Sequence, residues 1–186
     1  MINIVPYEPK YKEDLQKVCL NTAYETAYEP KERNFLLNTY CDYYLDVEGA
    51  CCFAAVDEND VAQGYILCAP DYKRFRKAVK PYAKIAAKSG FAHAVAGIGE
   101  RFVTGLFSRS FPAHMHIDIN PGFQRMGVGT KLVDALFQKL KSENVKGIML
   151  IVSTGNTKGM NFYLKYGFHR TATVGPGTVM TYKFQK

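Results

Sequence analysis

The segment from Asp118 to Leu132, DINPGFQRMGVGTKL, constrains the fold of this chain more than any other. A strand-like apolar run ends at Pro121, and an amphipathic helix begins around Gly127 and Gly129. The start of a helix presents unpaired backbone N–H groups and a positive dipole end, which together favour an anion. Glycines let a ligand approach the main chain and permit unusual torsions. The segment therefore predicts either a phosphate-binding turn or a tight connection in which the glycines serve packing alone.

The two common nucleotide-binding loops do not fit this segment. Gly122 and Gly127 have the spacing of a P-loop, but Val128 stands where that loop needs Lys. The run Gly127-Val128-Gly129 begins a dinucleotide fingerprint, but Leu132 occupies the position of its third glycine. The turn is therefore predicted either to hold a pyrophosphate in some other way or to serve packing alone.

The composition is that of an ordinary globular protein. The chain has 186 residues, of which 47% are hydrophobic and 22% charged. Its longest apolar runs, such as 147–152, are far too short to span a bilayer. The N-terminus lacks the basic start and long apolar stretch of a secretory signal. We expect a cytoplasmic protein with no membrane partner.

The five cysteines are odd in number and include no CxxC pair. Because these spacings match no metal or redox motif, we expect reduced packing residues and no metal site. Cys51 and Cys52 are adjacent, so they are expected to point to opposite faces of a strand.

The net charge of +7 is concentrated in the segment between Asp71 and Gly90. A basic segment can attract nucleic acid, a membrane surface or a polyanionic small molecule, or can be a solvated helix face. Tyr72, Phe75 and Tyr82 are interleaved with the charges, but no known binding motif frames them. No nucleic-acid partner is expected, and the segment is predicted to line the substrate cleft or to help hold phosphates. Its cations are Lys73, Arg74, Arg76, Lys77, Lys80, Lys84 and Lys88.

Hydrophobic periodicity predicts a single mixed α/β domain over residues 1–186, with a helical insertion at 71–110 between the third and fourth strands. The expected strands are 2–5, 51–57, 62–69, 111–119, 147–153, 170–174 and 179–184. The expected helices are 10–25, 32–44, two in 71–110 with a break near Pro81, one after the glycines to about 142, and 157–166.

The pattern Gln124-x-x-Gly127-x-Gly129 resembles the acetyl-CoA loop of the GNAT superfamily of N-acetyltransferases. The later motifs of that family follow in the same order, namely SxxN ending at Asn156, the pair 162–163 and the pair 167–168. The likeness covers nearly the whole chain, and its specific part runs from about residue 111 to the end. Within the superfamily, the run 112–129 looks most like a bacterial subset related to the acetyltransferase-like domain of O-GlcNAcase.

This resemblance implies an α/β GNAT fold, with a mixed, mostly antiparallel sheet of about six or seven strands. The fourth and fifth strands are expected to be parallel and splayed, with the arm of acetyl-CoA between them. A backbone N–H near Ile117 or Ile119 would polarise the thioester carbonyl. The implied contacts of the cosubstrate acetyl-CoA are Ile117, Ile119, Gln124, Arg125, Met126, Gly127, Val128, Gly129, Thr130 and Asn156.

Tyr163 is the implied acid of the reaction. It lies seven residues after Asn156, which is about two helical turns, so both side chains share one side of a helix. In the family the Tyr faces the thioester sulfur, where it would protonate the departing thiolate or stabilise its charge. The alternatives are a core aromatic for Tyr163 and a helix N-cap for Asn156.

An amine acceptor arrives protonated and must lose a proton before it attacks. His114, His116 and Asp118 alternate along one strand and should share one face. The family draws its base from this strand, so His116 and Asp118 are equal candidates and His114 ranks below them. The alternative is a hydrogen-bonded structural trio.

The resemblance therefore predicts transfer of an acetyl group from acetyl-CoA to a primary amine on a small molecule or peptide. No cysteine is placed by motif to accept the acetyl group, so direct transfer in a ternary complex is expected. The alternative is a non-catalytic module that binds acyl-CoA as a sensor or scaffold. A homodimer through the final strands is left open.

Overall fold

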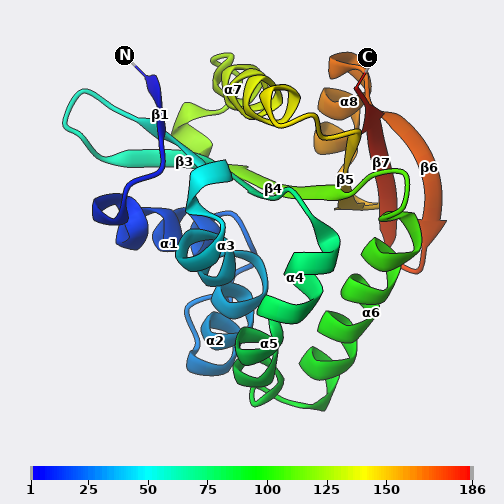
Figure 1. Cartoon of the computed structure of the whole chain (residues 1–186). Helices are drawn as coiled ribbons and strands as arrows, with labels where there is room; N and C mark the ends of the chain where they lie inside the picture. The colour runs from blue at the N-terminus through cyan, green and yellow to red at the C-terminus, as the bar shows by residue number, and fades with distance from the viewer. Residues whose placement is uncertain (1, 185–186) are drawn as a thin grey trace.

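The structure is a computed structural model that describes residues 2–184, and the seven strands of those residues form one sheet (Figure 1). The strand order is β1-β2-β3-β4-β5-β7-β6, and only the pair β4–β5 is parallel. The predicted fold class, a mixed and mostly antiparallel sheet, is confirmed. The strands are β1 (Asn3–Pro6), β2 (Phe53–Val56), β3 (Ala62–Ala69), β4 (Ala113–Ile119), β5 (Gly147–Ser153), β6 (His169–Val174) and β7 (Gly177–Lys183).

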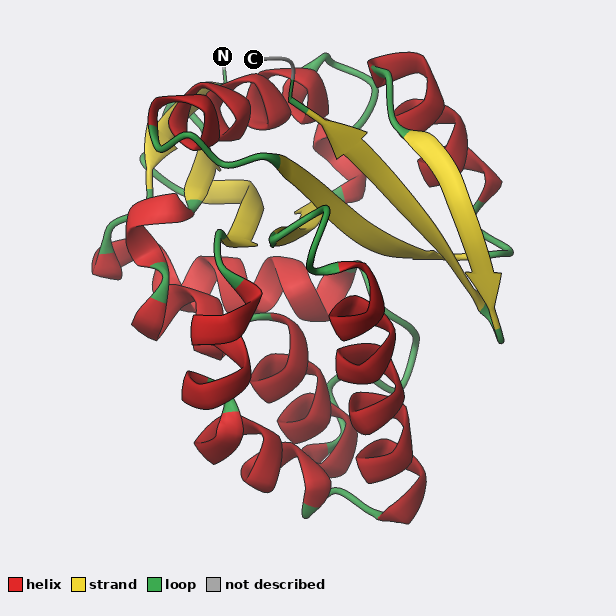
Figure 2. Cartoon of the chain, turned by 45° about the vertical axis from the view of Figure 1, so that its right-hand side comes forward, coloured by secondary structure: helices red, strands yellow, loops and turns green. Residues whose placement is uncertain are grey.

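Helices cover both faces of the sheet, as the red layers above and below the strands show in Figure 2. One face carries α7 (Val128–Ser142) and α8 (Thr157–Tyr166). The other face carries a larger helical layer, which consists of α1 (Lys12–Asn21), α2 (Pro30–Tyr40), α3 (Asp42–Val47), α4 (Tyr72–Ala78), α5 (Lys80–Ala87) and α6 (Phe91–Phe107).

The side chains of β4 alternate between these two layers, as the period of a strand requires. Ala113 and Met115 are buried in the core beneath α7. His114 and His116 point the other way, where both rings contact Tyr44 of α3. The second half of β4 therefore presents its polar residues to the helical layer.

The predicted helix 32–44 is wrong in its extent, because the chain forms two helices there. Cys41 has φ −131° and ψ −70°, which ends α2 and begins α3. The start lies at Pro30, since a proline suits the first turn of a helix. The first predicted helix, 10–25, is also shorter, because Pro9–Tyr11 forms a 3-10 turn and α1 ends at Asn21.

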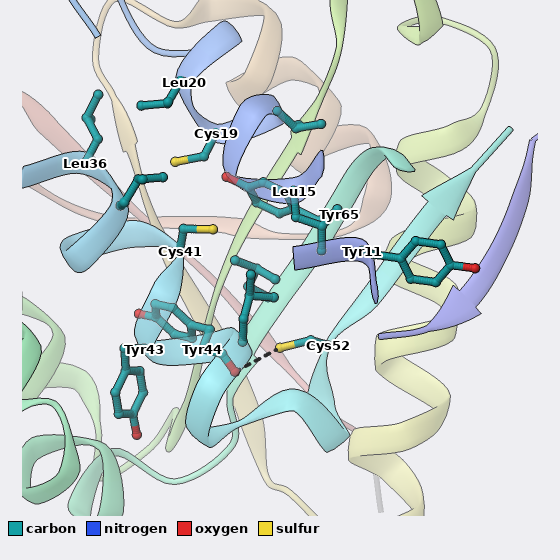
Figure 3. Close-up of a cluster of buried hydrophobic side chains, with 14 of the residues drawn as sticks. Tyr11, Leu15, Cys19, Leu20, Leu36, Cys41, Tyr43, Tyr44, Cys52 and Tyr65 are labelled. Atoms are coloured by element: carbon teal, nitrogen blue, oxygen red, sulfur yellow. Dashed lines mark hydrogen bonds between the residues drawn. The ribbon is translucent and has the colours of Figure 1, made fainter. Parts of the chain in front are cut away.

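Four tyrosines fill much of the core between α1, α3 and the sheet, where Figure 3 shows Tyr11, Tyr43, Tyr44 and Tyr65. Burying a hydroxyl is costly unless it is hydrogen-bonded. Tyr43 accordingly donates to Glu48 at 2.7 Å, and Tyr65 donates to Asp118 at 2.6 Å. The cysteines are free and buried, with Cys51 and Cys52 in the cores on opposite faces of the sheet.

The basic segment lies in α4 and α5, on the face of the sheet opposite to α7 (Figure 1). Asp71 caps α4 by accepting a hydrogen bond from the N–H of Arg74 at 2.9 Å. The guanidinium of Arg74 pairs with the buried carboxylate of Glu48. At least one of the seven cations therefore holds the fold together. Because the basic segment and the start of α7 lie on opposite faces of the sheet, the structure gives no support to the prediction that this segment holds phosphates at the glycine turn.

Within residues 2–184, no helix combines the length and the apolar character that crossing a bilayer requires.

Candidate active site

A gap opens in the middle of the sheet between β4 and β5. The parallel ladder joins only Ala113 to Ile148 and His114 to Met149. Beyond this point β5 stays paired with β7, whereas β4 becomes partly exposed from His116 onward. The two strands therefore splay apart, as predicted.

The main chain of β4 turns polar groups into this gap. Asn120 donates its N–H to the carbonyl of Gln63 at 2.9 Å, next to the β3–β4 register pair of Gly64 and Ile119. In an antiparallel pair, alternate residues direct both their N–H and C=O toward the neighbouring strand. Asp118 and Asn120 thus face β3, and the N–H groups of Ile117 and Ile119 point into the gap.

The loop after β4 is tied to the end of that strand. The side-chain amide of Gln124 donates to the carbonyl of Ile119 at 2.9 Å. Arg125 is held at φ +62°, a left-handed conformation that few residues other than glycine adopt. Strained torsions of this kind cluster at functional sites, so the conformation of Arg125 makes this loop a candidate for one.

The two glycines of the loop serve different purposes. Gly127 has φ +76° and is the N-cap of α7, without any side-chain hydrogen bond to the helix. A Cβ at Gly127 would meet no heavy atom within 4 Å, so the space beside it is open. A Cβ at Gly129 would lie 3.3 Å from the ring of Phe162 in α8. Packing explains Gly129, whereas Gly127 leaves the first N–H groups of α7 uncovered and accessible.

The other predicted loop residues lie around the same helix start. Val128 is buried beneath the helix, and the side chains of Arg125, Met126 and Thr130 are exposed. An anion that approached Gly127 would therefore meet main-chain N–H groups, a guanidinium and a hydroxyl.

Asn156 occupies the N-cap of α8. Its Oδ1 accepts a hydrogen bond from the N–H of Gly159 at 2.8 Å, as the structural alternative predicted. Tyr163 follows on the same helix and is buried, with its ring against Phe162 and Phe168. Both residues therefore have structural roles.

The hydroxyl of Tyr163 makes no hydrogen bond to any residue that the structure describes. Burial raises the pKa of Tyr163, and the nearby charge of Asp118 raises it further. A phenol of this kind is a weaker acid than a thiol, whose ordinary pKa is near 8.5. Tyr163 is therefore better suited to hydrogen-bond a developing thiolate than to give its proton away.

The predicted trio shares one face of β4, as expected, but its members differ in chemistry. The hydroxyl of Tyr44 lies 3.0 Å from Nε2 of both His114 and His116. Burial lowers the pKa of His114 to about 3 and that of His116 to about 4. Both rings are neutral at pH 7 and are weak bases. The network matches the structural alternative for these two residues.

Asp118 is the member of the trio with a pKa closer to neutrality. Burial raises the pKa of its carboxyl to about 6, although the hydrogen bond from Tyr65 opposes the shift. The same carboxylate is close enough to Tyr163 to raise the pKa of that phenol. Asp118 is therefore the stronger candidate base of the trio, and its charge acts on the hydroxyl of Tyr163.

Glu100 is a further candidate that the sequence did not predict. Its Oε1 lies 4.0 Å from Nε2 of His116, and burial raises its pKa to about 7. The residue comes from α6, in the segment to which no chemistry was assigned. The sequence carries one indication of a special role for Glu100, because it is the only acidic residue in a helix that is otherwise almost apolar.

A cavity of about 20 Å³ lies behind this network, between α2, α6 and β4. Thr39, Tyr44, Glu100 and His114 are among the residues on its wall. The Oγ1 of Thr39 and the Nδ1 of His114 are buried without a hydrogen-bond partner among the described residues. The volume suits about one water molecule, which needs polar partners such as these.

Among residues 2–184, no group of three or more His, Cys, Asp or Glu side chains has the arrangement of a metal site. The gap between β4 and β5 is the candidate place for a ligand.

A family model for acetyltransferases, described as the acetyltransferase (GNAT) family, matches residues 14–168. The chain belongs to the GNAT family. It is an acyltransferase, and its acyl donor is acetyl-CoA. The alternative of a non-catalytic sensor has no support.

Solved structures of this acetyltransferase fold align along nearly the whole chain. SsHAT superposes with a TM-score of 0.87 at 24% identity and 98% coverage of both chains. The PaiA N-acetyltransferase of Thermoplasma acidophilum, in complex with coenzyme A, gives 0.65 at 15% identity over 99% of each chain. A polyamine N-acetyltransferase of Drosophila melanogaster gives 0.68 at 14% identity, over 99% of this chain and 100% of the other. These likenesses show the fold.

Proposed function

We propose that this GNAT acetyltransferase moves an acetyl group from acetyl-CoA to a primary amine, by direct attack of the amine on the thioester. The gap between β4 and β5 carries the proposal. Three features support it: the N–H groups of Ile117 and Ile119 point away from β3, the loop after β4 leads into the uncovered start of α7, and the charge of Asp118 acts on Tyr163. One extended ligand with a phosphate end and a reactive carbonyl end fits all three features.

The donor would be held by main chain more than by side chains. In the proposal, the N–H groups after Gly127 contact the pyrophosphate, and Arg125 adds a positive charge at the loop. The N–H groups of Ile117 and Ile119 hydrogen-bond the arm and the thioester carbonyl. Asn156 and Gln124 hold the two flanking segments, α8 and the loop, in place.

The base of the proposal is Asp118. A base works best when its pKa lies near the working pH, which favours the carboxyls over the two histidines. The charge of Asp118 acts on Tyr163, whereas Glu100 lies behind His116. In the reaction, Asp118 takes a proton from the ammonium, the amine nitrogen bonds to the acetyl carbon and the carbon–sulfur bond breaks. Tyr163 hydrogen-bonds the thiolate, which takes the second proton that the nitrogen loses as the amide forms, and Asp118 returns its own proton to solvent.

Direct transfer, without an acetyl-enzyme, is supported by the burial of the cysteines. Burial also raises the pKa of Cys52 to about 12, and a thiol in that state is a poor nucleophile. The acceptor is proposed to be a small-molecule or peptide amine.

Three finer points belong to the same proposal. We treat residues 1–186 as one domain with 71–110 as an insertion, since α4, α5 and α6 pack onto the same core as α2 and α3. We place the protein in the cytoplasm. The likeness of residues 112–129 to the acetyltransferase-like domain of O-GlcNAcase supports membership of that subset.

Calorimetric titration with acetyl-CoA tests the proposal, with Gly127→Glu and Gly175→Glu compared with wild type. Both glycines have positive φ and open space around a Cβ, so both variants carry the same charge and a similar backbone strain. Only Gly127 lies at the start of α7. We expect micromolar binding by wild type and Gly175→Glu, and loss of binding in Gly127→Glu. Equal loss in both variants, or no binding by wild type, would overturn the assignment of the loop. Thiol release with a panel of amines then identifies the acceptor.

A further inference from the structure

The outer face of α6 is apolar along its full length. Its exposed positions carry five large apolar side chains, and between them only alanine and glycine. No charged or polar side chain is exposed on this helix. The five are 52% to 86% exposed, and they are Phe91, Val95, Ile98, Phe102 and Leu106. We call this surface the α6 seam.

The α6 seam lies at the upper end of the size that an apolar patch reaches on a typical monomer. At about 200 Å² for a large apolar side chain, the five expose roughly 600 Å², the upper limit for the largest patch of a typical monomer. Two such seams facing each other would bury roughly 1,200 Å², which reaches the lower bound for a specific, stable interface. The area is therefore right for a partner that covers the whole length of the helix.

The order of residues along the seam is symmetric about its centre. When two copies of α6 run antiparallel, Phe91 faces Leu106 and Val95 faces Phe102. At the centre, Ile98 of each copy faces the main chain at Gly99 of the other, where there is no side chain to block it. Antiparallel packing of this kind is what a two-fold axis produces, because the same patch must be complementary to itself.

The spacing of the seam also fits a helix partner. Its residues recur at intervals of four, three, four and four, the pattern of helices that pack side by side. Ala92, Ala96 and Gly99 are exposed between them, and small residues let two helices approach closely. A membrane surface would need neither the symmetry nor the small residues.

We propose that the protein forms a homodimer in which the α6 helices of the two copies pack antiparallel through the α6 seam. This interface differs from the final strands, through which the sequence left a homodimer open. The inference does not depend on the proposed function. Figure 1 shows α6 at the outer side of the helical layer, where a second copy can reach it.

Analytical ultracentrifugation of the full chain at micromolar concentrations tests the proposal. We expect wild type at twice the chain mass of 20.9 kDa, and Ile98→Lys as a monomer, since the change places a charge on each side of the axis. Ile85→Lys is the matched control, because Ile85 is exposed on α5 outside the seam. It should remain a dimer. A monomeric wild type, or a dimeric Ile98→Lys variant, would overturn the interface.

A crosslink gives a second readout, which does not rely on a variant that loses a contact. A side chain at Gly99 meets no heavy atom within 4 Å, so Gly99→Cys fits the fold. With the native cysteines buried, an added disulfide oxidant should link two copies only through this position. We expect a covalent dimer in nearly full yield, and little from Lys88→Cys, at the exposed residue that follows α5. Equal yields, or flotation of monomeric protein with phosphatidylserine vesicles, would contradict the dimer.

Discussion

The carboxylate of Glu100 lies 4.0 Å from Nε2 of His116, and this contact joins a helix of the 71–110 segment to the strand at the gap. The segment therefore contributes to the polar network of the site, in addition to the basic surface that its sequence shows. The relationship also places a carboxyl with a raised pKa inside the protein, where its ionisation affects both folding and chemistry.

Replacing Glu100 by Gln should stabilise the protein at high pH. The folded-state pKa of about 7 lies above the ordinary value of 4.5, so the folded state holds its proton more tightly than the unfolded state does. Stability is then full below about pH 4.5 and falls as the pH rises through 7. We expect Glu100→Gln to gain about 2–3 kcal/mol over wild type at pH 8, and little at pH 5.

Urea unfolding at the two pH values measures this difference. Glu13→Gln is the control, because Glu13 is exposed in the first turn of α1. It should show no comparable change between pH 5 and pH 8. A gain of equal size at both pH values in Glu100→Gln would assign the effect to packing instead of ionisation.

Asp118→Asn should remove the acidic limb of the rate profile. A base must be deprotonated to act, so kcat/KM should rise with pH through about 6, the pKa of Asp118. We expect a loss of about 100-fold or more in the variant. Tyr65 can still donate to the amide oxygen at this position, so the fold should persist. In the companion variant Glu100→Gln, kcat/KM should still rise with pH through about 6. If that rise disappears in Glu100→Gln, Glu100 is the base instead.

Tyr163→Phe should lower kcat and leave the KM for acetyl-CoA nearly unchanged. The hydroxyl is proposed to hydrogen-bond the thiolate only as the thioester breaks, and a hydrogen bond to a charged group is worth about 1.5–3 kcal/mol. We expect a fall of about 10- to 100-fold, measured by thiol release at saturating substrates. Tyr166→Phe is the matched control on the same helix, because that hydroxyl donates to Asp134. Equal losses in both would refute the assignment.

Arg125→Gly should separate binding from stability. Glycine accepts the left-handed torsion of this position without strain, although it also costs entropy on folding, so unfolding should change by less than about 1 kcal/mol. The affinity for acetyl-CoA should fall several-fold, because a positive charge leaves the loop. Calorimetry and urea unfolding measure the two quantities. Unchanged affinity would show that the main chain alone recognises the phosphates.

The parts of the fold that were predicted correctly rest on local patterns. The glycine turn, the apolar face of α7 and the alternation of His114, His116 and Asp118 each follow from the order of neighbouring residues. The break at Cys41 was missed because its torsions are set by packing in the core, and the apolar period continues through it.

The partners of the site residues could not be predicted in the same way. Side chains from three elements approach the residues of β4 across large distances in the sequence. They are Tyr44 of α3, Tyr65 of β3 and Glu100 of α6. Burial beneath these elements sets the direction of the pKa shifts along β4, and the resulting values favour Asp118 over His116. A pattern within one strand indicates which residues share a face, but it does not show what they meet there.

The short ladder between β4 and β5 divides the sheet into two blocks, β1 to β4 on one side and β5 with β7 and β6 on the other. Only the pairs at Ala113 and His114 connect the blocks directly, so the sheet has a hinge near its centre. A ligand bound in the gap would connect the two blocks where β4 and β5 are not paired with each other. We therefore expect acetyl-CoA to slow amide exchange on both sides of the hinge, including strands that it does not touch.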